Sequence, residues 1–241
     1  MIVNYTESGW KIISQRSHGL LAGQICAFWK PIAQFERWVE LLIATAEHDD
    51  VYNEFENDDL LNENGGPVHF KGTTFKYDYA QRLVQMAETK SAYIALLVSR
   101  HIQFVHGADP AADAFIRDLK VKEKKWIKTA GMSAAQVSSS YELLGFCDAF
   151  SLLICQDLIQ PEHRKIEISN GPDGIAYEMH ALNADKITVK PWPFKAKTFE
   201  VYYESKTIAQ LSFKTIAEFR KVFHSAETIT HKLTLSAVEM S

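Results

Sequence analysis

Histidine and aspartate residues stand at unusual places along this chain of 241 residues. His18 begins one apolar helical pattern, His48 and Asp49 end a second, His101 lies within a third, and Asp148 lies within a fourth. Neutral imidazoles and carboxylates are side chains that bind divalent cations. Four helices that each offer such a ligand predict a metal site between them.

Asp148 is the most informative of these residues, because it is the one charge between Glu142 and Asp157 in an apolar helical pattern. A bare buried carboxylate is costly, so it is normally paired, hydrogen-bonded or bound to a cation. One interpretation is a bond to a Trp, Tyr or Arg of a neighbouring helix. We expect instead that Asp148 lies within about 5 Å of His48 or Asp49, because two buried carboxylates need a shared cation or a proton.

Each of the other candidates also has a plain structural interpretation. His18 can cap its helix or stay in water, and His48-Asp49 can simply end a helix. His101 can be a core histidine with satisfied hydrogen bonds. The metal prediction therefore depends on the joint order of the residues, which is His, His-Asp, His and Asp.

Composition and absent motifs narrow the possible function classes. The chain has 26 basic and 30 acidic residues, a formal charge of -4 and 46% hydrophobic residues. These values indicate a globular protein without a basic surface for nucleic acid or anionic lipid. The sequence has no P-loop, Rossmann, G-x-S-x-G or H-E-x-x-H motif, which disfavours nucleotide cradles and hydrolase elbows.

Neither a secretion signal nor a membrane span is expected. The first residues lack the basic and apolar regions of a signal peptide. The longest nearly uncharged run, 143–155, is shorter than the roughly 20 helical residues that cross a bilayer. Cys26, Cys147 and Cys155 lie in apolar stretches without a C-x-x-C pair, which predicts buried reduced thiols. We therefore expect a cytoplasmic protein.

The elements that must position the candidate ligands are mainly helical up to residue 160. A hairpin is expected over about 2–13. Helices follow at about 17–30, 35–49, 77–88, 91–105, 110–129 and 133–159, with Ser17 as the first N-cap. The acidic stretch 50–74 contains N-E-N-G-G-P and predicts a loop over the mouth of the ligand cluster. Its residues that could face a substrate are Tyr52, Phe55, His69 and Phe70.

After Pro161 a two-residue periodicity replaces the helical one. Strands are expected at about 165–169, 175–182, 187–189, 199–203 and 229–235, with one helix at about 215–223. We expect a mainly α fold, in which residues 1–160 form the hairpin and a helical bundle, and residues 161–241 form a small antiparallel sheet packed on it. The hairpin could join that sheet. Trp192 and Phe194 of the P-W-P-F segment are expected to cover the seam between sheet and helices.

The ligand order resembles that of the HD metal-dependent phosphohydrolase superfamily, with a His on one helix, a His-Asp pair on another and an Asp on a later one. The surrounding segments are similar to a bacterial family described as domain of unknown function 3891, over nearly the whole chain. In that family Ala typically follows the first histidine, where this chain has Gly19, and Gly-Trp follows H-D-D, where it has Val51-Tyr52. The segments that carry this second resemblance are G-W-K-I-I-S-Q-R-S-H-G-L-L-A-G-Q, A-T-A-E-H-D-D, G-G-P-V-H-F, L-L-V-S-R-H, L-L-G-F-C-D-A-F-S-L-L-I-C and V-K-P-W-P-F.

The HD resemblance implies an HD-domain-like helical bundle and a ligand set for one divalent cation, with Mn, Fe, Mg, Co and Zn all open. His101 would be an additional ligand or the catalytic proton donor. His69 and His106 are weaker candidates, and the cations nearby in sequence that could bind phosphate are Arg100, Arg82 and Lys71. The implied metal ligands are His18, His48, Asp49 and Asp148.

Three functions are compatible with these residues. The first is a metal-dependent hydrolase of a small substrate that can carry a phosphate group. In this enzyme a metal-bound water attacks a phosphoester. The second is a di-iron oxygenase, which needs His101 and one more histidine in the same cavity. The third is a non-enzymatic ligand-binding or structural protein that keeps the polar cluster for stability. In each case we expect no nucleic acid and no membrane as partner.

Overall fold

Most helices of the protein begin and end within a few residues of the boundaries predicted from the sequence. The computed structural model describes residues 1–30, 37–57 and 59–237. Its helices are α1 Gln15–Ala27, α2 Trp38–Ala46, α3 Tyr77–Glu88, α4 Ala92–His106, α5 Asp113–Ala130, α6 Ala134–Cys155 and α7 Ile216–Ser225, with short 3-10 turns at Phe70–Gly72 and Pro110–Ala112. The start of the second helix expected from about residue 35 lies outside the described residues.

Serine side chains fix where several helices begin. Ser14 caps α1 by accepting a hydrogen bond from the Ser17 backbone nitrogen, so the expected cap at Ser17 is wrong by one turn. Ser91 caps α4, and Ser133 forms a capping box with Gln136 at the start of α6. The earlier start of α1 places Gln15 and His18 on one face of its first turn.

All strands of the described residues belong to one sheet, which runs in the order β1-β2-β6-β7-β5-β4-β3. The strands are β1 Ile2–Thr6, β2 Gly9–Ile13, β3 Ile166–Asn170, β4 Ala176–Asn183, β5 Lys186–Lys190, β6 Thr198–Ile208 and β7 Thr228–Ser236. β5 and β7 pair in parallel, and the other neighbours are antiparallel. The N-terminal hairpin joins the C-terminal strands, because Trp10 of β2 pairs with Ile208 of β6.

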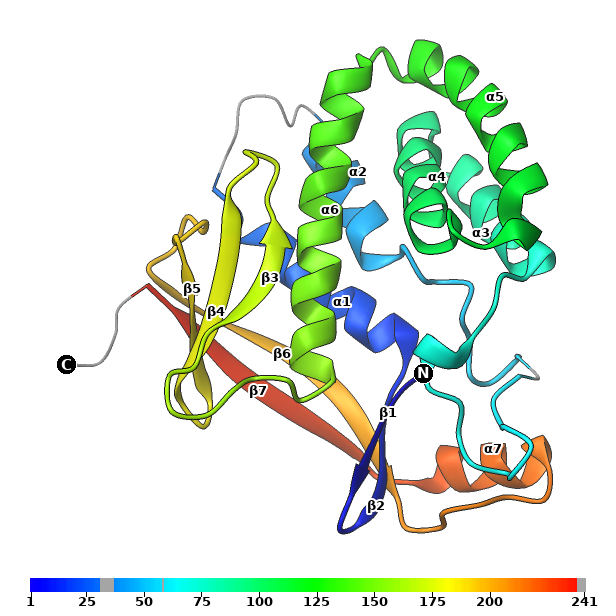
Figure 1. Cartoon of the computed structure of the whole chain (residues 1–241), viewed down its shortest axis with the longest axis vertical. Helices are drawn as coiled ribbons and strands as arrows, with labels where there is room; N and C mark the ends of the chain where they lie inside the picture. Colours follow the sequence, from blue (N-terminus) through cyan, green and yellow to red (C-terminus); the bar gives the residue numbers. More distant parts are fainter. Residues whose placement is uncertain (31–36, 58, 238–241) are drawn as a thin grey trace.

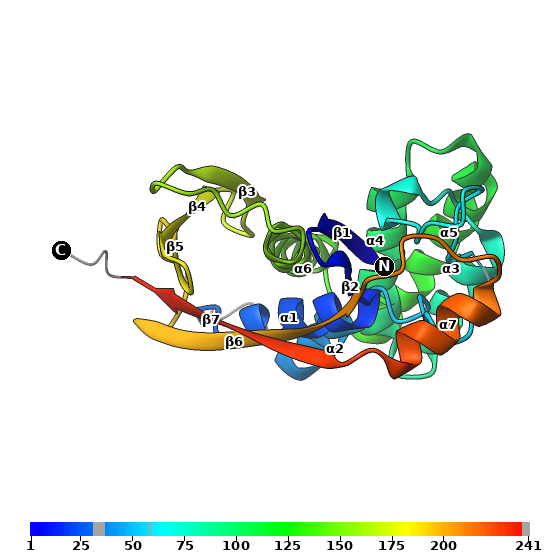
Figure 2. The same cartoon turned by 90° about the horizontal axis from the view of Figure 1, so that it is seen from below.

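The expected mainly α bundle with a small antiparallel sheet is wrong. The protein is a mixed fold with 46% helix and 23% strand, and its seven-stranded sheet is curled into a half-barrel. In Figure 2 the strands curve around α6, which is seen almost end-on, and α1 lies along β6. The expectation failed because it treated the sheet as a small appendage of the bundle. The hairpin, which could join that sheet, does so through the β2-β6 pair, and the sheet has seven strands, one pair of them parallel.

Helix α6 is the central element of this arrangement (Figure 1). It packs against α1, α2, α4 and β3, so apolar residues are needed all round it. Among the described residues, α6 is the one helix long and apolar enough to cross a membrane, but 56% of its apolar window is buried. This burial is that of the core helix of a soluble protein.

Aromatic rings close the seam between α1 and the sheet, as expected for the P-W-P-F segment. The Phe194 ring lies 5.0 Å from Trp192, 4.9 Å from Phe199 of β6 and 6.1 Å from Trp29, measured between ring centroids. Phe194 is 1% exposed and forms an isolated bridge with Trp29. This cluster anchors the C-terminal end of α1 to the sheet. Free, buried thiols are confirmed for the three cysteines, Cys26, Cys147 and Cys155.

Candidate metal centre

The five predicted residues converge at one place inside the helical layer. His18 lies in the first turn of α1, His48 and Asp49 follow the end of α2, His101 lies in α4, and Asp148 lies in α6. All are buried except Asp49, which is half-buried. The expected proximity of Asp148 to the His48-Asp49 pair is confirmed, since Oδ1 of Asp148 lies 3.2 Å from Nε2 of His48.

Close packing of α1 on α2 brings the first two ligand positions together. A Cβ atom at Gly19 would lie 2.5 Å from the backbone oxygen of Ala46, and one at Gly23 would lie 2.9 Å from the Ala46 Cβ. Side chains at either position would push the helices apart. Glycine at 19 instead of the alanine typical of the similar family is therefore a packing requirement of this chain.

The hydrogen bonds of His18 determine which of its nitrogens faces the cluster. The Ser151 hydroxyl donates its one hydrogen to the backbone oxygen of Asp148 at 2.9 Å, so toward His18 it can only accept. Nδ1 of His18 lies 2.9 Å from that hydroxyl and must carry the proton. The lone pair of Nε2 is then free, and it points at Oδ2 of Asp49 across 3.3 Å.

His48 is oriented in the same way. Its Nδ1 donates to the backbone oxygen of Thr45 at 2.8 Å, which leaves Nε2 as its free nitrogen. Among the described residues Nε2 has no partner with hydrogen-bond geometry, although Asp148 lies 3.2 Å away and Oδ2 of Asp49 lies 3.8 Å away. With both imidazoles neutral, two lone pairs and two carboxylates would therefore face one another in a buried space.

Asp49 is the hub of these contacts. Its Oδ2 accepts a 2.8 Å hydrogen bond from Nε2 of Gln15, and its Oδ1 lies 3.6 Å from Nε2 of His101. The side-chain oxygen of Gln15 is buried and has no partner within the described part of the chain. Gln15 thus orients the Asp49 carboxylate and leaves an unused acceptor at the edge of the cluster.

The pKa values show that this arrangement attracts positive charge. Burial disfavours the charged form of His48, but the charges of Asp148 and Asp49 outweigh burial and raise the pKa of His48 to about 9. Burial would raise the pKa of Asp49, yet His48 and the contacts of His101 and His18 hold that pKa well below its ordinary value. The pKa of Asp148 is likewise lowered against burial, chiefly by His48.

The donor set fits one divalent cation. Two groups of residues each bring their ligand atoms within 4.8 Å of one another. One group is His18, His48 and Asp49, and the other is His48, His101 and Asp148. Both groups use the same His48, whose Nδ1 is already bonded to Thr45. A neutral imidazole offers a single lone pair, so the two groups describe one ion position rather than two.

A cavity of about 260 Å³ opens over the cluster. Its polar floor contains Asp49, Asp148, His101 and the side chain of Gln15. Its other lining residues come mainly from α4, α6 and the stretch 50–74, and they are Met1, Tyr52, Phe70, Lys71, Thr73, Val105, His106 and Leu152. The expectation that this stretch covers the cluster is thus confirmed for its parts near Tyr52 and Phe70.

Other residues predicted to contact the substrate lie elsewhere. Arg82 pairs with Glu56 at 3.2 Å, and Arg100 pairs with the buried Glu123 at 3.1 Å. His69 packs on Phe70 and accepts a hydrogen bond from the backbone nitrogen of Lys71, and it does not line the cavity. Of the three predicted phosphate-binding cations, only Lys71 lines the cavity.

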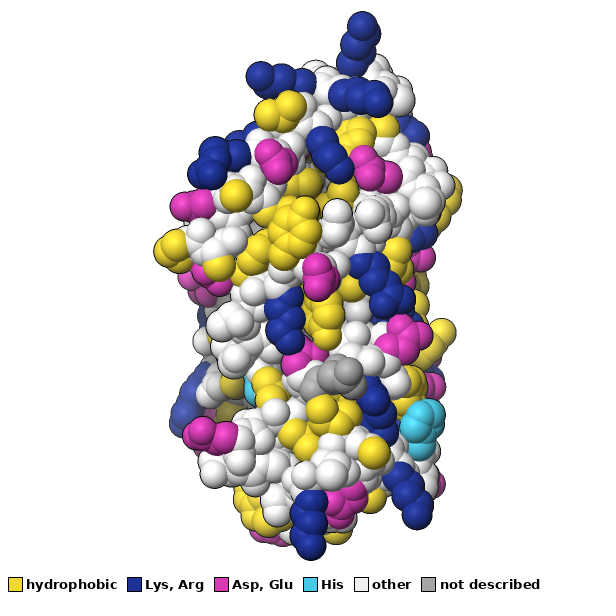
Figure 3. All heavy atoms as spheres, turned by 90° about the vertical axis from the view of Figure 1, so that its right-hand side faces the viewer, with side chains coloured by type: hydrophobic (Ala, Val, Ile, Leu, Met, Phe, Trp, Pro, Cys, Tyr) yellow, Lys and Arg dark blue, Asp and Glu magenta, His cyan; other side chains and the backbone are white. Residues whose placement is uncertain are grey.

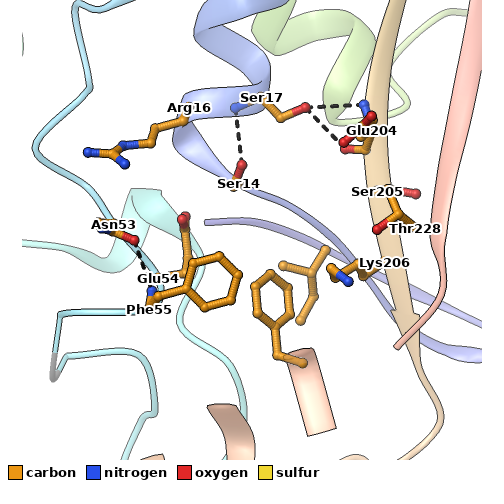
Figure 4. A pocket seen from close by; sticks show the side chains of 12 residues that line it. Ser14, Arg16, Ser17, Asn53, Glu54, Phe55, Glu204, Ser205, Lys206 and Thr228 are labelled. Carbon is orange, nitrogen blue, oxygen red and sulfur yellow. Dashed lines mark hydrogen bonds between the residues drawn. The ribbon is translucent and has the colours of Figure 1, made fainter. Parts of the chain in front are cut away.

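Phe55 lines a second cavity of about 200 Å³ on the opposite side of the first turn of α1 (Figure 4). Its polar side chains already bond to their neighbours: Ser14 to Ser17, Ser17 to the Glu204 backbone, and Asn53 to Phe55. Arg16 points toward the loop after α2, where it binds the Asp50 backbone oxygen. This cavity contains none of the predicted metal ligands.

The residues that sequence reasoning missed are those that orient the ligands. Thr45 contributes its backbone oxygen, which any residue would supply, whereas Gln15 and Ser151 each stand three positions from a candidate ligand on the same helical face. That spacing of a polar residue beside a ligand was the available signal.

Comparison with known proteins gives one family match. The family model described as "Protein of unknown function (DUF3891)" matches residues 1–210, which include all five residues of the cluster. No curated protein and no solved structure matches the chain. The family match carries no activity, and these comparisons give no support to membership of the HD superfamily.

Proposed function

The chain belongs to the DUF3891 family, and we propose that it is a divalent-metal hydrolase that cleaves a small phosphoester with an HD-like ligand set. One observation carries this proposal: the inward-facing nitrogens of His18 and His48 and the carboxylates of Asp49 and Asp148 face one another beneath a cavity that the two carboxylates line. Without a cation, the two buried carboxylates need another positive charge nearby, which in the metal-free protein is a proton on His48, whose pKa is raised to about 9.

The proposed chemistry assigns a role to each residue. Two histidines and two carboxylates leave open positions on a divalent cation, which would supply an acidified water as nucleophile. Gln15 holds Asp49 in place through its 2.8 Å hydrogen bond. His101 lines the cavity and lies 3.6 Å from Asp49, from where it would pass a proton to the leaving group.

The single ion position favours hydrolysis over the di-iron alternative. A second iron would need its own ligands, and the two candidate groups within the described residues share His48. His106, the nearest further histidine of the cavity lining, lies in neither group.

The surface charge supports a small substrate rather than a polyanion. On the face with α3 and α5, basic and acidic side chains are interspersed (Figure 3), and the formal charge of the chain is -4. A polyanion is attracted to a continuous basic surface, so a small molecule is the better candidate partner.

Metal analysis tests the first half of the proposal. Protein purified without chelator should contain close to one equivalent of a divalent metal, and His48→Gln should lose it. His224→Gln, an exposed histidine of α7, is the matched control and should keep the metal. A polar cluster that only braces the helices would give metal-free wild-type protein.

Turnover tests the second half. Phosphoesters should be assayed with protein loaded with Mn, Fe, Co, Mg or Zn. We expect at least one metal to support hydrolysis that His48→Gln abolishes. Background rates for every combination, with metal stoichiometrically bound, would refute the hydrolase.

A further inference from the structure

Lys71 is the one lysine or arginine that lines the cavity over the cluster, within the residues that the structure describes. Its amine forms no ion pair among those residues and lies 5.9 Å from the centroid of the Phe70 ring. Arg82 and Arg100 are engaged by Glu56 and Glu123. The cavity therefore has a single uncommitted positive side chain.

The net charge of the cavity with one divalent cation bound can be counted from its lining residues. The two positive charges of a divalent cation are cancelled by Asp49 and Asp148. Among the described residues, Asp49 and Asp148 are the acidic side chains of the cavity lining. With the histidines neutral, Lys71 gives the cavity one net positive charge.

Much of the remaining lining is apolar, beside the polar Gln15, Thr73 and His106. Phe70 and Tyr52 come from the stretch after the His-Asp pair, Val105 comes from α4, and Leu152 comes from α6. Burial keeps the Tyr52 hydroxyl protonated, because it raises the pKa of that group. Such walls stabilise an organic substituent through contact, whereas inorganic phosphate or a small polar ester would leave them unfilled.

We propose that the substrate is a phosphodiester with one negative charge and an apolar or aromatic substituent, and that Lys71 selects it. The inference rests on the proposed hydrolase function and narrows its substrate class. A phosphodiester carries one negative charge at neutral pH and matches the single net charge of the cavity. A phosphomonoester carries close to two.

The reaction balances without another reactant. A water oxygen forms a bond to phosphorus, the bond from phosphorus to the leaving oxygen breaks, and one water proton reaches that oxygen by way of His101. The products are an alcohol and a phosphomonoester. Because the monoester carries more negative charge than the cavity neutralises, it is expected to leave without a second cleavage.

Two substrates with the same leaving group test this inference. Metal-loaded protein should hydrolyse bis(p-nitrophenyl) phosphate with a higher kcat/KM than p-nitrophenyl phosphate. Lys71→Gln should lower kcat/KM for the diester about tenfold, chiefly through KM, as expected for loss of one charge-assisted contact. Lys120→Gln, at an exposed lysine of α5, is the matched control and should behave as wild type.

The outcomes separate this inference from the proposed function. Preference for the monoester, or an unchanged KM in Lys71→Gln, would overturn the diester assignment while the hydrolase stands. If neither ester is cleaved, melting temperatures with diphenyl phosphate and phenyl phosphate decide. Greater stabilisation by diphenyl phosphate, lost in Lys71→Gln, would support the ligand class while the hydrolase falls. No such difference would overturn both.

Discussion

Asp148 is the residue at which a metal ligand and a structural brace give opposite expectations. We expect Asp148→Asn to abolish metal binding and to leave the protein folded, because the change removes the repulsion from Asp49 together with the ligand. A brace predicts unchanged metal content and a free energy of unfolding lowered by about 1–3 kcal/mol, since the partner of Asp148 loses its bond. Metal stoichiometry and melting temperature of one sample distinguish the two.

Asp118→Asn is the matched control, because Asp118 is exposed on α5. It should change neither metal content nor melting temperature. Full metal occupancy in Asp148→Asn would show that Asp148 is not a ligand.

The pH dependence of the metal-free protein depends on His48. Its folded pKa of about 9 exceeds its ordinary value of 6.5, so its contribution to stability is complete below pH 6.5 and is lost as pH rises through 9. In chelator, the free energy of unfolding should fall between pH 7 and pH 10, by on the order of 2–3 kcal/mol at most. Urea unfolding at several pH values measures this fall.

Asp148→Asn is also the control for this pH dependence, because it removes the charge that does most to raise the pKa of His48. Its stability should change less between pH 7 and pH 10 than that of the wild type. Equal slopes in the two proteins would contradict the assignment to His48.

At acid pH the sign reverses: the lowered pKa values of Asp49 and Asp148 stabilise the fold above about pH 3.8, and that stability is lost as pH falls.

At this scale the sequence predicted well that the five residues converge, and it predicted their supporting contacts poorly. His101 and Asp148 stand out because each is polar within an apolar helical pattern. Gln15 and Ser151 do not, because serine and glutamine occur on many helix surfaces, and Thr45 acts through its backbone oxygen, which no residue type indicates. Their role depends on which nitrogen of a histidine faces inward, which only the packed structure defines.

Among the elements, the contact of α1 with α2 sets the distance from His18 to the His48-Asp49 pair. Gly23→Ala would place a Cβ 2.9 Å from the Ala46 Cβ, which cannot move aside as a flexible side chain would. We expect the helices to separate slightly, with stability lowered by about 1–3 kcal/mol as in overpacked cores. Metal affinity should fall as well, which a competition titration with a fluorescent chelator measures.

Gly145→Ala gives the contrast, because no atom lies within 4 Å of its Cβ position in α6. Alanine is the better helix former, so this change should stabilise the protein by about 0.5–1 kcal/mol without altering metal affinity. Equal behaviour of the two variants would mean that α1 and α2 do not set the ligand spacing.

Element boundaries followed from local signals wherever those signals were unambiguous. The helix at Tyr77–Glu88 agrees with its prediction, and Ser91 and Ser133 mark the starts of α4 and α6. The start of α1 was misplaced because Ser14 and Ser17 are both good caps and the sequence does not rank them. β6 was predicted about half as long as it is, because its second half pairs with the distant hairpin.

For the whole molecule, the order of the strands is the part that local patterns could not give. Two-residue periodicity identified strands but not their partners, and the parallel pair β5-β7 and the pair β2-β6 both join distant segments. The apolar surface all round α6 indicated burial on every side. It did not indicate that strands β3 to β7 form part of that enclosure.

The same long-range pairing leads to a prediction about the division near residue 160. We expect residues 1–160, expressed alone, to show no cooperative unfolding, because the hairpin loses its partner β6, α1 loses its contact with β6, and α6 loses β3. Strands without a partner and helices without a covered apolar face are marginal in water. The full chain should unfold in one transition, with coincident curves from far-ultraviolet circular dichroism and tryptophan fluorescence.

Mixing the fragment with residues 161–241 is the control, since complementation should restore both the transition and metal binding. A fragment that melts cooperatively at the temperature of the full chain and binds metal would show instead that the helical part is an independent domain.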